Sequence, residues 1–193
     1  MTTLLLTGAV LPGTGFGNEA AGEGDPRRRS PEVTVTARGI LHVHSCPPAL
    51  CPHVTWAVTR VLGAPVDLAW SHAASPRLLR AECEWNGAVG TASRLASALK
   101  GWQPLRFEVV ELASPGCDGR RYSYTGTLGL FSTPISANGD VMVGEDQIRS
   151  TLNTGGDLRA ALDQLLDTAW DDELEDYRKA GYLASVNRVA KVV

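Results

Sequence analysis

The chain has 193 residues, of which 44% are hydrophobic and 20% are charged, and its formal net charge at pH 7 is −3. This balance is typical of a soluble globular protein and excludes a chain that is disordered throughout. The interspersed charges argue against binding to nucleic-acid phosphates or to an anionic membrane surface, and no apolar run reaches the roughly 20 residues of a membrane helix.

The first 34 residues differ in composition from the rest of the chain. Between Gly13 and Ser30 the only large apolar side chain is Phe16, and a β-rich sequence begins at Val33. Such a segment buries too little apolar surface to offset the entropy lost on ordering. We therefore expect residues 1–34 to be disordered, or to precede a true translation start at Val35 whose codon could be GTG. Residues 35–193 are expected to form a single domain.

Residues 35–112 carry a β-α-β-β-α-β pattern. Alternation predicts strands over residues 38–44, 66–70, 78–85 and 105–112, and helical spacing predicts helices over 48–62 and 91–100. This order is that of the ferredoxin-like, or split βαβ, fold, an antiparallel sheet in the order 4-1-3-2 with both helices on one face. The predicted fold class is therefore α+β.

The predicted strands have one apolar face and one charged face, because successive side chains point to opposite sides of a sheet. The face expected to meet the helices carries Leu41, Val43, Leu68, Trp70, Ala81, Cys83, Trp85, Phe107 and Val109. The opposite face carries Ile40, His42, His44, Arg80, Glu82, Glu84, Arg106 and Glu108.

Residues 113–193 are predicted to enlarge this core. Turn signals separate predicted strands over residues 121–125, 128–132 and 140–143, which should extend the sheet from its strand-four edge as hairpins. Two helices follow, over 145–153 and from 157 to about 178, separated by Gly155 and Gly156. The second helix carries apolar residues at helical spacing and needs a hydrophobic partner.

Several separated motifs resemble the actinobacterial domain-of-unknown-function family 3145 (DUF3145). The resemblance spans about residues 35–182 and rests on RGILHVHS, ALCPHVTWAV, GTASRLASALKGW, SPGCDG, NGDVMV-EDQIR and AWDDELEDYRKAG. It implies a start near Val35 and a link to fatty-acid or lipid metabolism, and it implies no established activity.

His44 with Glu82 and Glu108 forms the first candidate site. The strand of His44 should lie between those of the two glutamates, where carboxylates would raise the imidazole pKa and produce a general base. A cross-strand salt-bridge ladder explains the same residues and is the more common arrangement. With Arg80 and Arg106 nearby, this face is also a candidate for ligand binding.

Gly90, Thr91 and Arg94 form a second candidate at the start of the helix predicted over 91–100. Backbone N–H groups at a helix N-terminus, with an arginine one turn later, could hold a phosphate or carboxylate. A simple N-cap at Gly90 or Thr91 accounts for the same residues.

Histidines and cysteines cluster at His42, His44, Cys46, Cys51 and His53. Their spacing matches no standard zinc pattern, and free cysteine is commonly a small buried hydrophobe. We therefore expect no metal and no cofactor. The four cysteines are expected to be reduced thiols in the cytoplasm, since a chain of this length needs no disulfide and its first residues lack the basic region of a secretion signal.

The stretch from Trp170 to Tyr177 combines acidic and aromatic residues. It could be a docking surface for a basic partner, with Trp170 and Tyr177 as anchors and Asp172 and Glu175 as charges. Alternatively, it is a solvated helix face whose Trp170 packs on the sheet.

The sequence favours a non-catalytic module that binds a protein partner or small ligand, with no nucleic acid and no membrane; a homo-oligomer stays open. The alternative is a small enzyme that uses His44 with Glu82 or Glu108.

Overall fold

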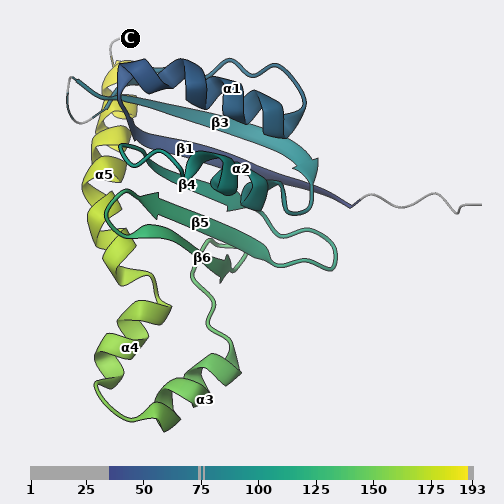
Figure 1. Cartoon of the computed structure of the whole chain (residues 1–193), viewed down its shortest axis with the longest axis vertical. Helices are drawn as coiled ribbons and strands as arrows, with labels where there is room; N and C mark the ends of the chain where they lie inside the picture. The colour runs from purple at the N-terminus through teal and green to yellow at the C-terminus, as the bar shows by residue number, and fades with distance from the viewer. Residues whose placement is uncertain (1–34, 74, 76, 191–193) are drawn as a thin grey trace, which may run out of the picture. The chain divides into compact units, whose positions relative to one another are not determined.

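A computed structural model of the protein describes residues 35–73, 75 and 77–190, with side chains up to residue 179. The segment predicted to be disordered, residues 1–34, lies outside this part. The structure contains one six-stranded sheet in the order β2-β3-β1-β4-β5-β6, in which every neighbouring pair is antiparallel (Figure 1). The strands are β1 (Thr36–Cys46), β2 (Ser71–His72), β3 (Leu79–Ala88), β4 (Arg106–Glu111), β5 (Gly119–Thr125) and β6 (Gly129–Ile135).

The helices confirm the predicted α+β class. A short 3₁₀ turn, η1 (Pro48–Leu50), leads into α1 (Cys51–Leu62), and α2 (Thr91–Leu99) follows β3. The last part of the chain forms α3 (Glu145–Thr154), α4 (Leu158–Leu165) and α5 (Thr168–Ala190). None of the helices in the described part of the chain combines the length and apolar character needed to span a bilayer.

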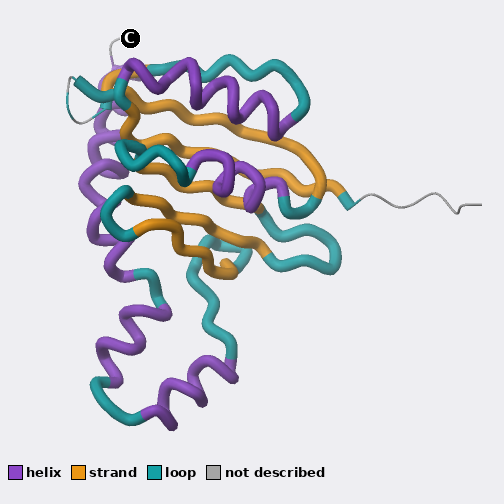
Figure 2. Tube along the Cα trace, in the orientation of Figure 1, coloured by secondary structure: helices purple, strands orange, loops and turns teal. Residues whose placement is uncertain are grey.

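The apolar core lies between the sheet and helices α1 and α2, which lie in front of the strands in Figures 1 and 2. Leu41, Val43, Phe107 and Val109 of the sheet are buried in this layer, as the strand alternation predicts. The helices contribute buried residues at helical spacing, namely Val54, Val58, Leu95 and Leu99.

Gly39 allows β1 to pass close to its neighbours on this face. A Cβ atom at Gly39 would lie 2.0 Å from the carbonyl oxygen of Val110 and 2.3 Å from Cζ2 of Trp85. The Trp85 ring therefore packs directly against the backbone of β1, a contact that any other residue at position 39 would prevent.

Three predicted elements differ from the structure. The strand predicted over 66–70 is absent; Leu68 is instead buried in the core and Trp70 donates a hydrogen bond from Nε1 to Oγ1 of Thr55, so side-chain packing on α1 replaces strand pairing there. The strand predicted over 140–143 is reduced to a single bridge between Ile135 and Val141. The long helix predicted from residue 157 is interrupted at Asp167, whose φ of 67° is incompatible with a continuous α-helix.

Helix α5 runs across the strands (Figure 1). Its side chains contact the charged face of the sheet. Leu174 is fully buried there, and Trp170 donates a hydrogen bond from Nε1 to the carbonyl oxygen of Gly129. The two sheet faces are thus covered differently, one by an apolar layer and the other by a layer of charged pairs.

Candidate functional site

His44 and Glu108 meet on the charged face of the sheet. Nε2 of His44 lies 2.8 Å from Oε2 of Glu108, and each side chain is only 7% exposed. In the ladder it is His42, not His44, that lies opposite Glu108 on β4, and the register of β1 shifts between Val43 and Ser45. This irregularity brings the His44 ring within reach of Glu108.

Arg178 of α5 donates to both oxygens of the Glu108 carboxylate. Its Nε donates to Oε2 over 2.9 Å, and its second guanidinium nitrogen donates to Oε1. Burial by itself would raise the pKa of Glu108, but hydrogen bonds and charges from His44 and Arg178 outweigh it and hold the pKa of this carboxyl well below its usual range. Glu108 is therefore ionised, buried and hydrogen-bonded at both oxygens.

Further charged side chains continue this cluster along α5. Arg178 also donates to Oδ1 of Asp171 over 2.7 Å. Arg121 on β5 lies 3.5 Å from Asp171 and 3.5 Å from Asp167, at the junction of α4 and α5. We call His44, Glu108, Arg121, Asp167, Asp171 and Arg178 the α5 seam.

Asp167 is the unusual member of the α5 seam. Its side chain is 0% exposed, and within the described part of the chain its Oδ1 has no hydrogen-bond partner. Burial raises the pKa of Asp167 to about 6, against the opposing effects of the neighbouring Ser123 and Arg121. This carboxyl therefore titrates closer to neutrality than any exposed aspartate would.

Glu82 does not reach His44. Its carboxylate lies 3.6 Å from Nδ1 of His42 and is 52% exposed. Burial lowers the pKa of His42, although Glu82 opposes this. The candidate trio of histidine and two glutamates is thus divided into a buried pair, His44 with Glu108, and a partly exposed pair, His42 with Glu82.

The predicted ligand-binding arginines have separate positions. Arg106 donates to Glu173 over 3.1 Å and lies 5.0 Å from the centre of the Tyr177 ring, so it too fastens α5. Arg80 lies opposite Ser71 of β2, towards the other edge of the sheet.

The N-terminus of α2 already holds a carboxylate, that of Glu111. The backbone N–H groups of Gly90 and Ala92 donate to its two oxygens, each over 2.9 Å. Thr91 donates to the carbonyl of Ala88 and accepts from Arg94, over 2.7 and 2.6 Å. The groups predicted to bind an external anion are therefore engaged within the chain.

Glu111 was missed by the sequence reasoning, although a signal was present. It shares the strand face of Phe107 and Val109, which is the apolar one, and it is 7% exposed. A carboxylate at such a position must find donors inside the protein, and the nearest free N–H groups belong to a helix N-terminus.

The aromatic residues predicted to anchor a partner are used internally. Trp170 packs on Phe131 with ring centres 5.0 Å apart, and Tyr177 lies under Arg106. Asp172 and Asp176 are exposed, and the side chain of Glu175 is 47% exposed. The acidic predicted residues therefore face outward while the aromatic ones face the sheet.

Cys46 and Cys51 are buried free thiols whose sulfur atoms lie 3.6 Å apart. Burial raises the pKa of both. Over residues 35–73, 75 and 77–190, no three histidine, cysteine or acidic side chains are grouped as a metal site requires.

A hollow of about 380 Å³ lies beyond the α5 seam along β1 and β3, lined by residues including Arg38, Ile40 and Glu84. Neither His44 nor Glu108 borders it. The buried histidine pair therefore does not open into this space.

In the comparisons with known proteins, residues 40–191 match the family model described as "Protein of unknown function (DUF3145)". Neither the curated proteins nor the solved structures give a match.

Proposed function

The chain belongs to the DUF3145 family, and from its geometry we propose that it is a non-catalytic module that binds a basic protein partner. The contact is the outward surface of α5 formed by Asp172, Glu175 and Asp176, which we call the acidic strip. The proposal is supported by the way in which α5 is attached to the sheet.

The proposal is carried by the enclosure of Glu108, which is buried and hydrogen-bonded at both oxygens. Both of its oxygens accept hydrogen bonds, from His44 and from Arg178, in a site where His44 and Glu108 are each 7% exposed. A general base must reach the proton that it removes from a substrate, directly or through one water molecule. The pair is therefore better suited to attaching α5 to the sheet than to catalysis.

Fastening α5 from its inner side orients the acidic strip towards solvent. Arg178, Tyr177 and Trp170 all contact the sheet, whereas Asp172 and Asp176 are exposed. Glu175 forms an ion pair with Lys179 over 3.3 Å, which leaves the two exposed aspartates as the other charges of the strip. An excess of acidic side chains on a fixed helix accelerates association with a partner of opposite charge.

Residues 35–112 are proposed to be a ferredoxin-like unit. This is supported by their β-α-β-β-α-β order and by the position of β1 between β3 and β4. In such a unit both helices cover one sheet face, so the other face is available to receive α5. The fold thereby explains where the last helix binds.

Charge reversal of the acidic strip tests the proposal. We expect Asp172→Lys with Asp176→Lys to remove a protein partner that cross-linking and quantitative mass spectrometry identify with the wild-type chain in an extract of its own cells. Asp118→Lys with Asp140→Lys changes the net charge equally at exposed positions elsewhere and should retain that partner. Retention of the same partner by both double variants would contradict the proposal, as would a catalytic rate that disappears in His44→Ala.

A further inference from the structure

Helices α3 and α4 form a hairpin that contains no buried residue. Figure 1 shows the two helices set apart from the strands, beyond β6. They have 10 and 8 residues, below the roughly 12–15 at which an isolated helix becomes stable in water. Packing on the core therefore does not account for their presence.

Local interactions define the shape of this hairpin. The side chain of Gln147 accepts a hydrogen bond from the N–H of Gly144, and that of Asp157 accepts from Arg159 and Ala160. The linker residues Gly155 and Gly156 both adopt positive φ, which only glycine does readily. The surface between the helices is thus formed in advance of any partner.

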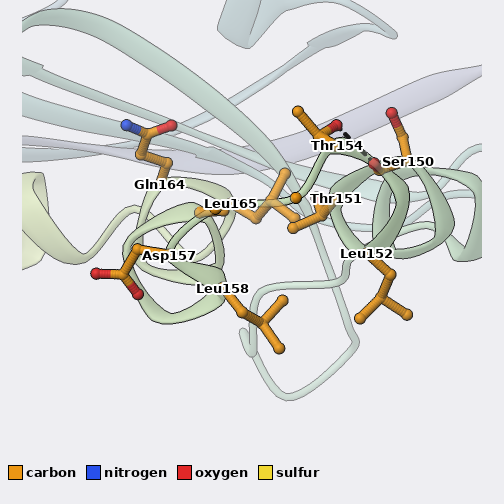
Figure 3. A pocket seen from close by; sticks show the side chains of 11 residues that line it. Ser150, Thr151, Leu152, Thr154, Asp157, Leu158, Gln164 and Leu165 are labelled. Carbon is orange, nitrogen blue, oxygen red and sulfur yellow. Dashed lines mark hydrogen bonds between the residues drawn. The ribbon is translucent and has the colours of Figure 1, made fainter.

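Apolar side chains on that surface are exposed to solvent. Leu152 is 60% exposed, Leu158 is 45% exposed, and Ile148, one turn before Leu152, is 40% exposed. A hollow of about 300 Å³ lies between the helices. In Figure 3 the Leu165 side chain lies between them, and those of Leu152 and Leu158 project on the same side.

The hairpin carries more acidic than basic side chains, namely Glu145, Asp146, Asp157 and Asp163 against Arg149 and Arg159, and Asp157 is the charged residue that lines the hollow. The two arginines of the hairpin are each paired one turn away, Arg149 with Glu145 and Arg159 with Asp163. Asp146 and Asp157 are exposed and have no basic partner among the described residues. A second copy of the chain would bring two such acidic surfaces together, whereas a basic segment would complement them.

We propose that the groove between α3 and α4 binds an amphipathic helix of a partner protein. Its leucine-like side chains enter the hollow beside Leu152, Leu158 and Leu165, and its lysines or arginines face Asp146 and Asp157. Helix-in-groove binding of this kind takes anchors spaced at i, i+3 or i+4, and i+7. The inference rests on the proposed function for the basic character of the partner, and it assigns a second surface to the contact.

A fluorescent helical peptide of leucine and lysine, with all leucines on one face, serves as the probe in anisotropy titrations of the full chain. We expect Leu152→Ser with Leu158→Ser to raise its Kd at least about tenfold, because two apolar contacts are lost. The matched control, Leu112→Ser with Leu128→Ser, changes leucines that are 40% and 38% exposed outside the hairpin, and it should leave the Kd unchanged. Thermal melts confirm that all variants fold.

Two further peptides separate sequence pattern from composition. A peptide with scrambled leucines and one with glutamate in place of lysine should both bind more weakly, and amide exchange should show protection over residues 145–165 only with the amphipathic basic probe. Equal binding of the three peptides, or an unchanged Kd in Leu152→Ser with Leu158→Ser, overturns the inference. So does light scattering that shows a wild-type dimer which this double variant converts to monomer.

The acidic strip is tested in the same titrations. Loss of probe binding in Asp172→Lys with Asp176→Lys, but not in the leucine double variant, overturns the groove and leaves the proposed function standing. The opposite pattern supports the groove, and the acidic strip is then judged separately by the extract experiment with its own double variants.

Discussion

His44 and Glu108 are 64 residues apart in the chain, yet Nε2 of the first lies 2.8 Å from Oε2 of the second in a site closed by Arg178. This pair marks the place where the last helix is joined to the central strands. Removing the pair should therefore lower the stability of the folded protein.

Glu108→Gln is expected to lower the free energy of unfolding by about 2–4 kcal/mol, because Arg178 loses its main partner while remaining partly buried. Urea denaturation at pH 7 measures this change. Glu82→Gln is the matched control, since Glu82 is 52% exposed, and it should cost less than about 1 kcal/mol. Equal effects of the two substitutions would show that burial of Glu108 contributes nothing.

The difference in the free energy of unfolding between the wild type and Glu108→Gln should shrink in acid. The pKa of Glu108 is lower in the folded than in the unfolded chain, so the stabilisation is present above the unfolded value of about 4.3 and is lost as the pH falls towards the folded value. Denaturation curves of the wild type and Glu108→Gln should therefore converge below about pH 4. A constant difference down to pH 2 would contradict this.

Asp167→Asn should stabilise the protein at pH 8 and change it little at pH 3, below both pKa values. The folded pKa of Asp167, raised to about 6 by burial, lies above the unfolded value near 3.9, so its ionisation destabilises the fold as the pH rises through this interval. Asparagine mimics the protonated carboxyl and also tolerates positive φ. A loss of stability at pH 8 would show instead that the charge of Asp167 is needed by Arg121.

Gly39→Ala is expected to destabilise the protein by about 3 kcal/mol or more, because its methyl group would overlap Val110 and Trp85. Gly101→Ala is the control, since a Cβ atom there meets nothing within 4 Å, and its effect should stay within about 0.5 kcal/mol. Thermal melts distinguish the two. A folded Gly39→Ala variant with an unchanged melting temperature would show that β1 can move away from β4.

In the native protein Cys117 should react with iodoacetamide while Cys46 and Cys51 do not. Cys117 is exposed, whereas the other two are buried with raised pKa values and hold little of the reactive thiolate. Mass spectrometry after brief labelling reads out each site. EDTA should leave the melting temperature unchanged; stoichiometric zinc that is lost in Cys51→Ala would contradict both expectations.

Strand alternation predicted which residues share the charged face, including His42, His44, Glu82 and Glu108, because a period of two depends on neighbouring residues alone. It did not predict which histidine meets which glutamate. That depends on the register shift near His44 and on Arg178, which lies 70 residues from Glu108. Such pairings follow from the assembled sheet and not from any local pattern.

The break before α5 escaped prediction for a related reason. Apolar residues keep a helical spacing from Leu158 to Leu174, so periodicity alone describes one continuous helix. The interruption comes from a single residue, Asp167, whose positive φ turns the chain so that Arg121 lies beside it. Aspartate adopts this conformation more readily than most residues, but it does so too seldom for the sequence to indicate a break.

The α5 seam also has a consequence for how the chain is made. Ribosomes synthesise β1 and β4 before α5, so His44 and Glu108 emerge well ahead of Arg178. During this interval water can hydrate both side chains. A nascent sheet with a charged face exposes little apolar surface to which other unfinished chains could bind. If leucines alone attached α5, the sheet face exposed before α5 binds would be apolar and would promote aggregation. Because the α5 seam is charged, the sheet can remain hydrated and soluble until α5 has been synthesised and binds to it.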